Sequence, residues 1–130
     1  MTDKPTDKAL VADLLALLDP APMGGDRFQG PRKMGGFGRV FGDRAAQVPV
    51  TSVKSMVGHC LGAAGGVEAA VLALTLSRGV IPPTIHHSET DGDCRIDVVA
   101  NESRETRIRC AVSTSLGFGG NDSAIVLRAI

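Results

Sequence analysis

Aromatic side chains are scarce in this chain of 130 residues, which has four Phe and neither Trp nor Tyr. Because 43% of the residues are nevertheless hydrophobic, any core must be built from Ala, Val, Leu and Ile. Side chains this small imply that backbone segments pack closely against one another. The length suits one domain.

Net charge is also lacking, since 14 Lys and Arg residues balance 14 Asp and Glu residues. This balance gives no electrostatic reason to expect nucleic acid or an anionic membrane as a partner. The apolar stretch at residues 58–76 contains His59 and Glu68, which favours a buried helix over a membrane span. A second apolar run, residues 9–18, is interrupted by Asp13, so we expect no signal peptide.

Cysteine is represented only by Cys60, Cys94 and Cys110, at irregular spacing. An odd number of cysteines in a chain this poor in them is not typical of a disulfide framework, so a reducing, cytoplasmic location is predicted. No pair has C-x-x-C spacing. We therefore expect no metal site, and we expect no other cofactor.

Composition divides the chain into two regions, residues 1–47 and 48–130. In the first, the three- and four-residue spacing of leucines predicts an amphipathic helix at residues 6–18, followed by a Gly- and Pro-rich linker. Residues 27–36 of this linker could cradle a phosphate, although a solvated loop is the favoured interpretation.

The second region has the regular patterns of an α/β domain. Residues 58–77 are predicted to form a helix that ends at Arg78-Gly79, and Pro82-Pro83 keeps its segment extended. Asp91-Gly92-Asp93 is typical of a turn. The predicted strands are residues 48–51, 95–99, 107–115 and 123–129, the last two paired around a glycine-rich connection.

His59 is the first candidate for chemistry. It is expected where the predicted helix begins, and there the positive end of the helix dipole disfavours a charged imidazole. Lys54 would act in the same direction if it lies nearby. A neutral histidine can donate a hydrogen bond to a carbonyl oxygen and stabilise negative charge there. The alternative is a core histidine whose ring is satisfied by a backbone carbonyl.

Glycines within the predicted helix are the second candidate feature. Gly62, Gly65 and Gly66 each cost a helix roughly 1 kcal/mol relative to alanine, so close approach of another helix or backbone is expected there. Glu68 is the only carboxylate in this apolar segment. A buried acid needs a partner, and Lys54 is the obvious one.

The third feature is the loop Gly117-Phe118-Gly119-Gly120, where glycines allow positive φ and close approach to a ligand. Amides in such a turn can form an anion nest or one half of an oxyanion hole. A wide hairpin turn is the alternative interpretation.

Four motifs follow one another along the chain: Val50-Thr51-Ser52-Val53-Lys54-Ser55-Met56-Val57-Gly58-His59, Leu61-Gly62-Ala63-Ala64-Gly65-Gly66-Val67-Glu68-Ala69, Ile81-Pro82-Pro83-Thr84 and Ser115-Leu116-Gly117-Phe118-Gly119-Gly120. Taken in this order they resemble the C-terminal half of β-ketoacyl-acyl carrier protein synthases, from about residue 41 to residue 130. The resemblance implies a thiolase-like α/β fold, with a mixed sheet and a buried small-residue helix.

The resemblance also implies an activity and a set of roles. The activity is an acyltransferase reaction of fatty-acid or polyketide biosynthesis, the decarboxylative Claisen condensation of a malonyl group on carrier protein with an acyl group. His59 would be the second catalytic histidine, Lys54 would organise the histidines, and Glu68 would pair with Lys54. Phe118, between Gly117, Gly119 and Gly120, would gate the acyl pocket and contribute its amide to the oxyanion hole.

The sequence departs from the family pattern in what accompanies these motifs. The nucleophilic cysteine and the first catalytic histidine belong to upstream segments that are not among these residues, and His86 and His87 lie away from the catalytic positions. Asn121-Asp122 replaces the usual threonine-asparagine. We therefore expect inactivity alone, with acyl carrier protein and an N-terminal synthase half or homologous subunit as partners. The alternative is a non-catalytic interaction module, or a truncated or fused remnant, that docks on a synthase or carrier protein.

The first forty residues carry a different, shorter resemblance. Segments 14–19, 26–30 and 38–42 are similar to the start of a hot-dog acyl-CoA thioesterase. The two resemblances meet around Arg39-Val40-Phe41-Gly42, which predicts a fusion or a recombined reading frame.

Overall fold

The computed structural model describes residues 40–90, 96–117 and 119–130. The helix predicted at residues 6–18, the possible phosphate loop at 27–36, the turn at 91–93 and Phe118 lie outside the described residues. Their structure therefore stays a prediction.

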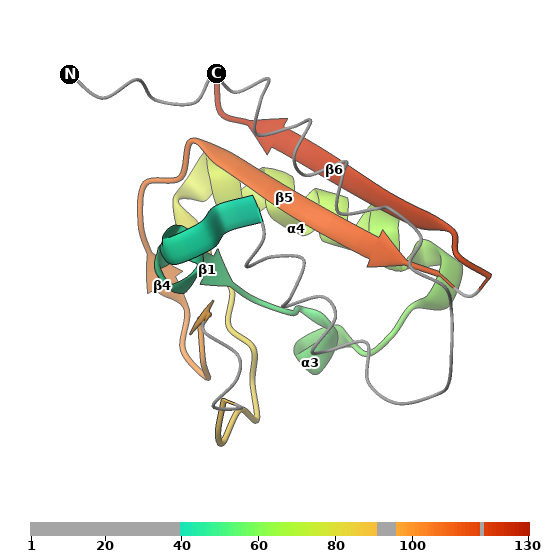
Figure 1. The fold of residues 1–130 in the computed structure, drawn as a ribbon, viewed down its shortest axis with the longest axis horizontal. Coiled ribbons are helices and arrows are strands. Elements are labelled where there is room, and N and C mark those ends of the chain that lie inside the picture. Colours follow the sequence, from blue (N-terminus) through green and yellow to red (C-terminus); the bar gives the residue numbers. More distant parts are fainter. Residues whose placement is uncertain (1–39, 91–95, 118) are drawn as a thin grey trace.

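The largest unit of the fold is a β-hairpin with a helix along it. Strands β5 (Cys110–Leu116) and β6 (Asp122–Arg128) pair antiparallel, with Cys110 opposite Arg128 and Leu116 opposite Asp122. Helix α4 (Ala64–Arg78) runs along this hairpin and contacts both strands (Figure 1). The predicted pairing of residues 107–115 with 123–129 is confirmed, with slightly shorter strands. We call α4, β5 and β6 the helix–hairpin unit.

The end of α4 follows the prediction and its start does not. Gly79 takes the left-handed conformation at φ 68°, and its amide donates to the Thr75 carbonyl at 2.9 Å. The helix begins at Ala64 rather than near Gly58, after the 3-10 turn η2 (Leu61–Ala63). Positive φ angles of 75° at Gly58 and 49° at Leu61 interrupt the helical path, so residues 58–60 form a loop.

Short strands make up the rest of the sheet structure. β1 (Pro49–Val50) pairs parallel with β3 (Asp97–Val98), and β2 (Val80–Ile81) pairs antiparallel with β4 (Arg104–Glu105). The strands predicted at 48–51 and 95–99 are thus present in shorter form. Pro49 occupies the first position of its strand, where a missing amide is tolerated. Parallel and antiparallel pairs together give the predicted mixed α/β character.

A small aliphatic core lies where these short strands meet. Ala45 of the 3-10 helix η1 (Gly42–Gln47) is buried with Val53, Ile81 and Val99, and Val99 is only 1% exposed. No aromatic side chain belongs to this group. The composition of the chain predicted this kind of core.

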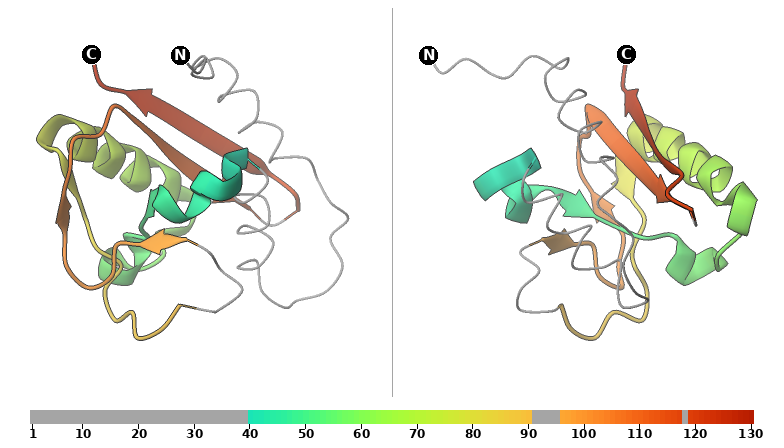
Figure 2. Two further views of the ribbon diagram at one scale, coloured as in Figure 1. Left: turned by 60° about the vertical axis from the view of Figure 1, so that its left-hand side comes forward. Right: turned by 45° about the vertical axis from the view of Figure 1, so that its right-hand side comes forward.

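Among the residues that the structure describes, other elements cover the small-residue helix α4 on one side only. Thr75 is its single buried residue, so the burial expected for this helix is met only on the side of the hairpin. Residues 61–78 pass a length and composition test for a membrane-crossing helix, with a mean hydropathy of 1.2 and 6% of the segment buried. Core helices of soluble proteins pass the same test, and α4 carries Glu68 in an ion pair. Both views in Figure 2 show no helix or strand of the described residues on the opposite side of α4.

Candidate functional site

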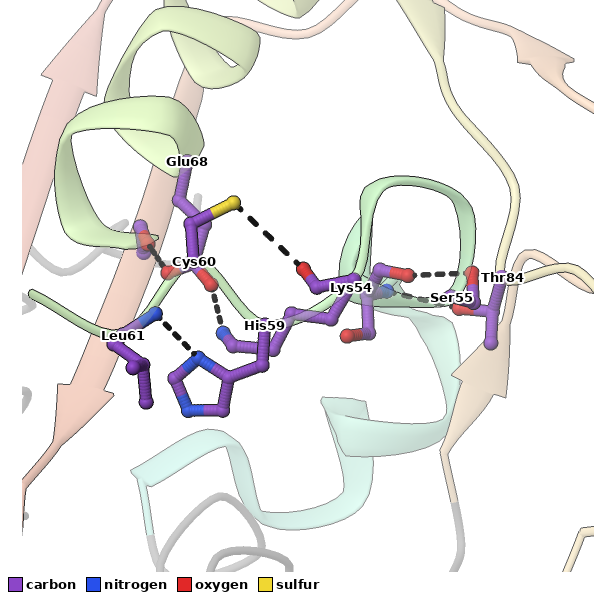
Figure 3. Close-up of polar contacts among 10 residues, drawn as sticks. Lys54, Ser55, His59, Cys60, Leu61, Glu68 and Thr84 are labelled. Atoms are coloured by element: carbon purple, nitrogen blue, oxygen red, sulfur yellow. Dashed lines mark hydrogen bonds and ion pairs between the residues drawn. The ribbon is translucent and has the colours of Figure 1, made fainter. Parts of the chain in front are cut away.

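An ion pair connects the short helix α3 (Lys54–Val57) to the helix–hairpin unit. Lys54 Nζ donates to Glu68 Oε1, and the Ser113 hydroxyl of β5 donates to Glu68 Oε2 at 3.1 Å (Figure 3). The Glu68 side chain is 13% exposed and that of Lys54 is 37% exposed. Both oxygens of the half-buried carboxylate thus have donors, as burial of a charge requires. The predicted contact between Lys54 and Glu68 is present.

His59 lies in the segment at residues 58–63, which we call the histidine loop. The Leu61 amide donates to His59 Nδ1 at 3.0 Å (Figure 3). Because Nδ1 accepts, the neutral ring that fits this bond carries its proton on Nε2 and can donate it outward. The side chain is exposed, so it is not the core histidine of the alternative interpretation.

The start of the helix lies a little later than the sequence predicted. His59 precedes by two residues the 3-10 turn η2, which leads directly into α4. The His59 ring is held by the hydrogen bond from Leu61, whose own backbone has a positive φ of 49°.

Large apolar side chains close to His59 in the chain are exposed. Met56 is 42% exposed, Val57 is 56% exposed and Leu61 is 76% exposed. We call these three residues the apolar rim. Adjacent exposed apolar side chains of this size mark interaction surfaces more often than solvated ones.

The glycines of α4 and η2 do not meet the close approach that was predicted. A Cβ on Gly65 would lie 3.6 Å from Ser115 Oγ, which is ordinary contact, and Cβ atoms on Gly62 and Gly66 would have nothing within 4 Å. Within the described part of the chain, the prediction holds weakly at Gly65 and is wrong at the other two positions. Gly66 lies on the uncovered side of α4, so no described element is there to approach it.

The glycine loop between β5 and β6 is a turn with the expected backbone. Gly119 and Gly120 have φ angles of 82° and 81°. The Gly117 amide donates to the Asn121 carbonyl at 2.8 Å, and a Cβ on Gly117 would lie 3.1 Å from that oxygen. A backbone carbonyl closes this turn, so the departure from threonine at position 121 does not remove the contact.

Hydroxyl groups around α3 were missed at the level of sequence. Thr51 Oγ1 donates to the Pro82 carbonyl at 2.7 Å, and the Ser52 amide donates to Thr84 Oγ1 at 2.8 Å. Ser55 Oγ accepts from the Ile85 amide at 3.0 Å. The signal available in the sequence was the double proline. Because proline has no amide hydrogen, this segment cannot form a complete strand ladder, and side-chain hydroxyls make hydrogen bonds in its place.

An ion pair outside the site joins two of the short strands. Both terminal guanidinium nitrogens of Arg104, Nη1 and Nη2, donate to the Asp97 carboxylate, at 2.5 and 2.9 Å. These hydrogen bonds hold the pKa of Asp97 below its ordinary value and raise that of Arg104. Over residues 40–90, 96–117 and 119–130, there is no group of three His, Cys, Asp or Glu side chains that could hold a metal ion.

Comparison with known proteins connects this geometry to a family. The family described as "Beta-ketoacyl synthase, C-terminal domain" matches residues 25–88. The tetracenomycin polyketide synthase ketoacyl synthase alpha subunit of Streptomyces glaucescens is 40% identical over 95% of this chain and 32% of its own length. The 3-oxoacyl-[acyl-carrier-protein] synthase 2 of Staphylococcus aureus is 46% identical over 68% of this chain and 22% of its own. The chain therefore spans a third or less of the curated relatives it matches.

Solved structures give the same result for the fold. The ishigamide ketosynthase/chain length factor superposes with a TM-score of 0.75 at 37% identity, over 82% of this chain and 26% of that one. The AntDE ketosynthase, in complex with the AntF acyl-carrier protein, superposes with a TM-score of 0.73 at 35% identity, over 76% of this chain and 24% of that one. The fold is thus that of the thiolase-like ketosynthases.

The family match also bears on the first forty residues. It begins at residue 25, upstream of residue 41 where the synthase resemblance of the motifs begins. A synthase origin, rather than the thioesterase resemblance, therefore accounts for residues 25–40. The division of the chain at residues 47 and 48 stays a prediction.

Proposed function

Since this chain belongs to the β-ketoacyl synthase family and corresponds to its C-terminal part, we propose that it supplies one wall of a condensing active site. The reaction is the decarboxylative Claisen condensation of a malonyl thioester with an acyl thioester in fatty-acid or polyketide biosynthesis. Loss of carbon dioxide leaves an enolate, whose carbon attacks the acyl carbonyl and expels the thiol that carried the acyl group. The chain is inactive alone, because the nucleophile comes from another part of the synthase.

The hydrogen bond from the Leu61 amide to His59 Nδ1 carries this proposal. It leaves Nε2–H free to donate to the malonyl thioester oxygen, where negative charge develops as carbon dioxide leaves. A donor that is already protonated and aimed requires little rearrangement at the moment of reaction. The exposure of His59 leaves room for a substrate on that side.

The ion pair between Lys54 and Glu68 helps to position the backbone that leads to His59. Lys54 belongs to the four-residue helix α3, directly before the histidine loop, and its ion pair fixes α3 to α4. The cationic amine also favours negative charge in its surroundings. Phe118 and its flanking glycines Gly117, Gly119 and Gly120 would gate the acyl pocket and contribute an amide to the oxyanion hole.

The proposed partners are an acyl carrier protein and a second synthase portion, either an N-terminal half or a homologous subunit. Two of the similar structures are a ketosynthase bound to its acyl-carrier protein and a ketosynthase/chain length factor. The apolar rim and the uncovered side of α4 are surfaces on which another part of a synthase could pack, and they support the proposal of a synthase partner. These reactions take place in the cytoplasm.

Reconstitution tests the proposal. The N-terminal part of the tetracenomycin ketoacyl synthase alpha subunit, produced without its matching C-terminal segment, is mixed with this chain, malonyl-carrier protein and an acyl donor. Condensed product is measured by mass spectrometry and association by sizing chromatography, with the N-terminal part alone as control. Association with product supports the proposal, and neither association nor product contradicts it.

Association without product would favour a second function, a docking module that binds a synthase partner without taking part in the chemistry. The exposure of Met56, Val57 and Leu61 is the observation in its favour. Condensation that depends on His59 separates the two functions.

A further inference from the structure

The one-turn helix α3 carries Lys54 and leads directly into the histidine loop, but it is too short to hold its own shape. A helix of four residues makes too few internal hydrogen bonds to offset the cost of nucleation. No residue of α3 itself is buried, and packing holds it only at its N-cap, Val53, which lies in the aliphatic core. Polar contacts to other segments therefore add to Val53 in fixing the position of α3.

The ion pair from Lys54 to Glu68 provides one of these attachments. The other attachments lie at the end of α3 that faces the extended segment after Pro82 and Pro83. Ser55 Oγ accepts from the Ile85 amide at 3.0 Å and donates to the Ser52 carbonyl at 2.8 Å. The same hydroxyl thus closes the start of the helix and ties it to a distant segment. Figure 3 shows Ser55 and Thr84 on this side of α3.

Thr84 anchors the other half of the contact. Its hydroxyl accepts from the Ser52 amide at 2.8 Å and lies 3.4 Å from the Thr51 hydroxyl. Its backbone is held on both sides, because its amide donates to the Val99 carbonyl at 2.8 Å and its carbonyl accepts from Asn101 at 2.9 Å. Val99 is the most deeply buried side chain of the core, so the Thr84 hydroxyl is a fixed point.

We propose that Ser55 and Thr84 form a hydroxyl clamp that positions His59, by fixing α3 so that the Leu61 amide meets His59 Nδ1. They are positioning residues, since neither touches the imidazole. The clamp is needed because Pro82 and Pro83 have no amides with which to form a strand ladder to residues 51–55. Its role in condensation rests on the proposed function of His59, but its effect on the ring does not.

The test uses the 130-residue chain and reads the ring directly. Two-dimensional NMR of ¹⁵N-labelled protein reports the protonation of Nδ1 and Nε2 of His59, and hydrogen exchange reports the Leu61 amide. Thr84→Val keeps the shape of the side chain and removes its hydroxyl, whereas Thr84→Ser keeps the hydroxyl. Ser55→Ala removes the other half of the clamp, and Ser77→Ala is the matched control, since Ser77 Oγ bonds the Leu74 carbonyl within α4.

Thr84→Val and Ser55→Ala are expected to mix the two neutral tautomers of His59. They should also raise the exchange rate of the Leu61 amide about tenfold, the effect of losing one hydrogen bond. Thr84→Ser and Ser77→Ala should keep the signals of the original chain. Unchanged His59 signals in a folded Thr84→Val or Ser55→Ala protein would overturn the proposal, and so would a Thr84→Ser protein that behaves like Thr84→Val.

Unfolding of both hydroxyl-free variants would also overturn it, because these hydroxyls would then hold the fold as a whole rather than the position of one loop. The outcome is separate from that of the reconstitution. A tautomer that depends on the clamp in a chain that supports no condensation would refute the proposed function and leave the clamp standing.

Discussion

The helix–hairpin unit and the histidine loop are neighbours in the chain, yet they hold their side chains by different means. In the helix–hairpin unit, α4 lies along two paired strands, and Glu68 has donors on both oxygens. In the histidine loop, His59 and its neighbours are exposed, and Gly58 and Leu61 have positive φ angles. Glu68 is thus paired within the chain, whereas the His59 side chain is exposed.

Exposed large apolar side chains occur in both regions, with Leu74 and Ile125 in the helix–hairpin unit and Met56, Val57 and Leu61 near His59 in the chain. A strained, exposed loop on a fixed scaffold is the usual arrangement of a functional site. Changes in the loop should therefore alter activity, and changes in the helix–hairpin unit should alter stability.

The largest expected effect is on activity. His59→Ala in the reconstituted synthase should lower the rate of condensation about 10²- to 10³-fold, as for loss of one donor to a developing oxyanion. Association and the unfolding midpoint should stay close to those of the original chain, because the side chain is exposed. His86→Asn is the control, since asparagine tolerates the positive φ of 60° at that position. Equal rates for the two variants would remove the functional distinction between loop and scaffold.

The second effect is on stability and concerns the helix–hairpin unit. Glu68→Gln removes the charge that pairs with Lys54, and it should lower the free energy of unfolding by about 1–3 kcal/mol. The half-exposure of Lys54 keeps this below the cost of breaking a fully buried pair. Urea denaturation measures it, with Glu102→Gln as the control at an exposed glutamate. A loss no larger than that of the control would mean that the ion pair does not anchor α3.

A third change tests the uncovered side of α4. Gly66→Ala should stabilise the chain by about 0.5–1 kcal/mol, because a Cβ there meets nothing and alanine is the better helix former. The same variant should weaken association with the N-terminal part, since the added methyl blocks close approach to the helix. Ala70→Gly, at another exposed position of α4, should instead destabilise the chain. Stabilisation with undiminished association would show that the partner does not approach this side.

The smallest effect is a pH dependence of the short strands. Because the pKa of Asp97 is lowered in the folded chain, its contribution is fully present above about pH 4 and is lost as the pH falls through the lowered value. Both side chains are partly exposed, so the contribution should stay below about 1 kcal/mol. Urea denaturation from pH 7 to pH 3 should show a steeper loss for the original chain than for Asp97→Asn. Parallel curves would contradict this.

Sequence patterns located most of the elements because those elements follow local rules. The residues of β6 largely alternate in burial, and Arg78-Gly79 supplies the cation and the left-handed residue that end α4. The start of α4 was placed too early, since Gly58 to Ala63 has a helix-like composition and nothing local records the positive φ at Leu61. In the folded loop that angle occurs together with the hydrogen bond from the Leu61 amide to the imidazole.

The sequence by itself determined the family motifs, the small aliphatic core and the pairing of Lys54 with Glu68, because a lone carboxylate in an apolar helix demands a cation. The tertiary structure decided how His59 is held and which groups hold it. The Ser55 hydroxyl and the Ile85 amide are 30 positions apart, and the Ser52 amide and the Thr84 hydroxyl are 32 apart. Side-chain hydroxyls find such partners only once the chain has brought the segments together. Hydrophobic periodicity and charge can be seen in a short stretch of sequence, whereas the orientation of the His59 imidazole is set only in the folded chain.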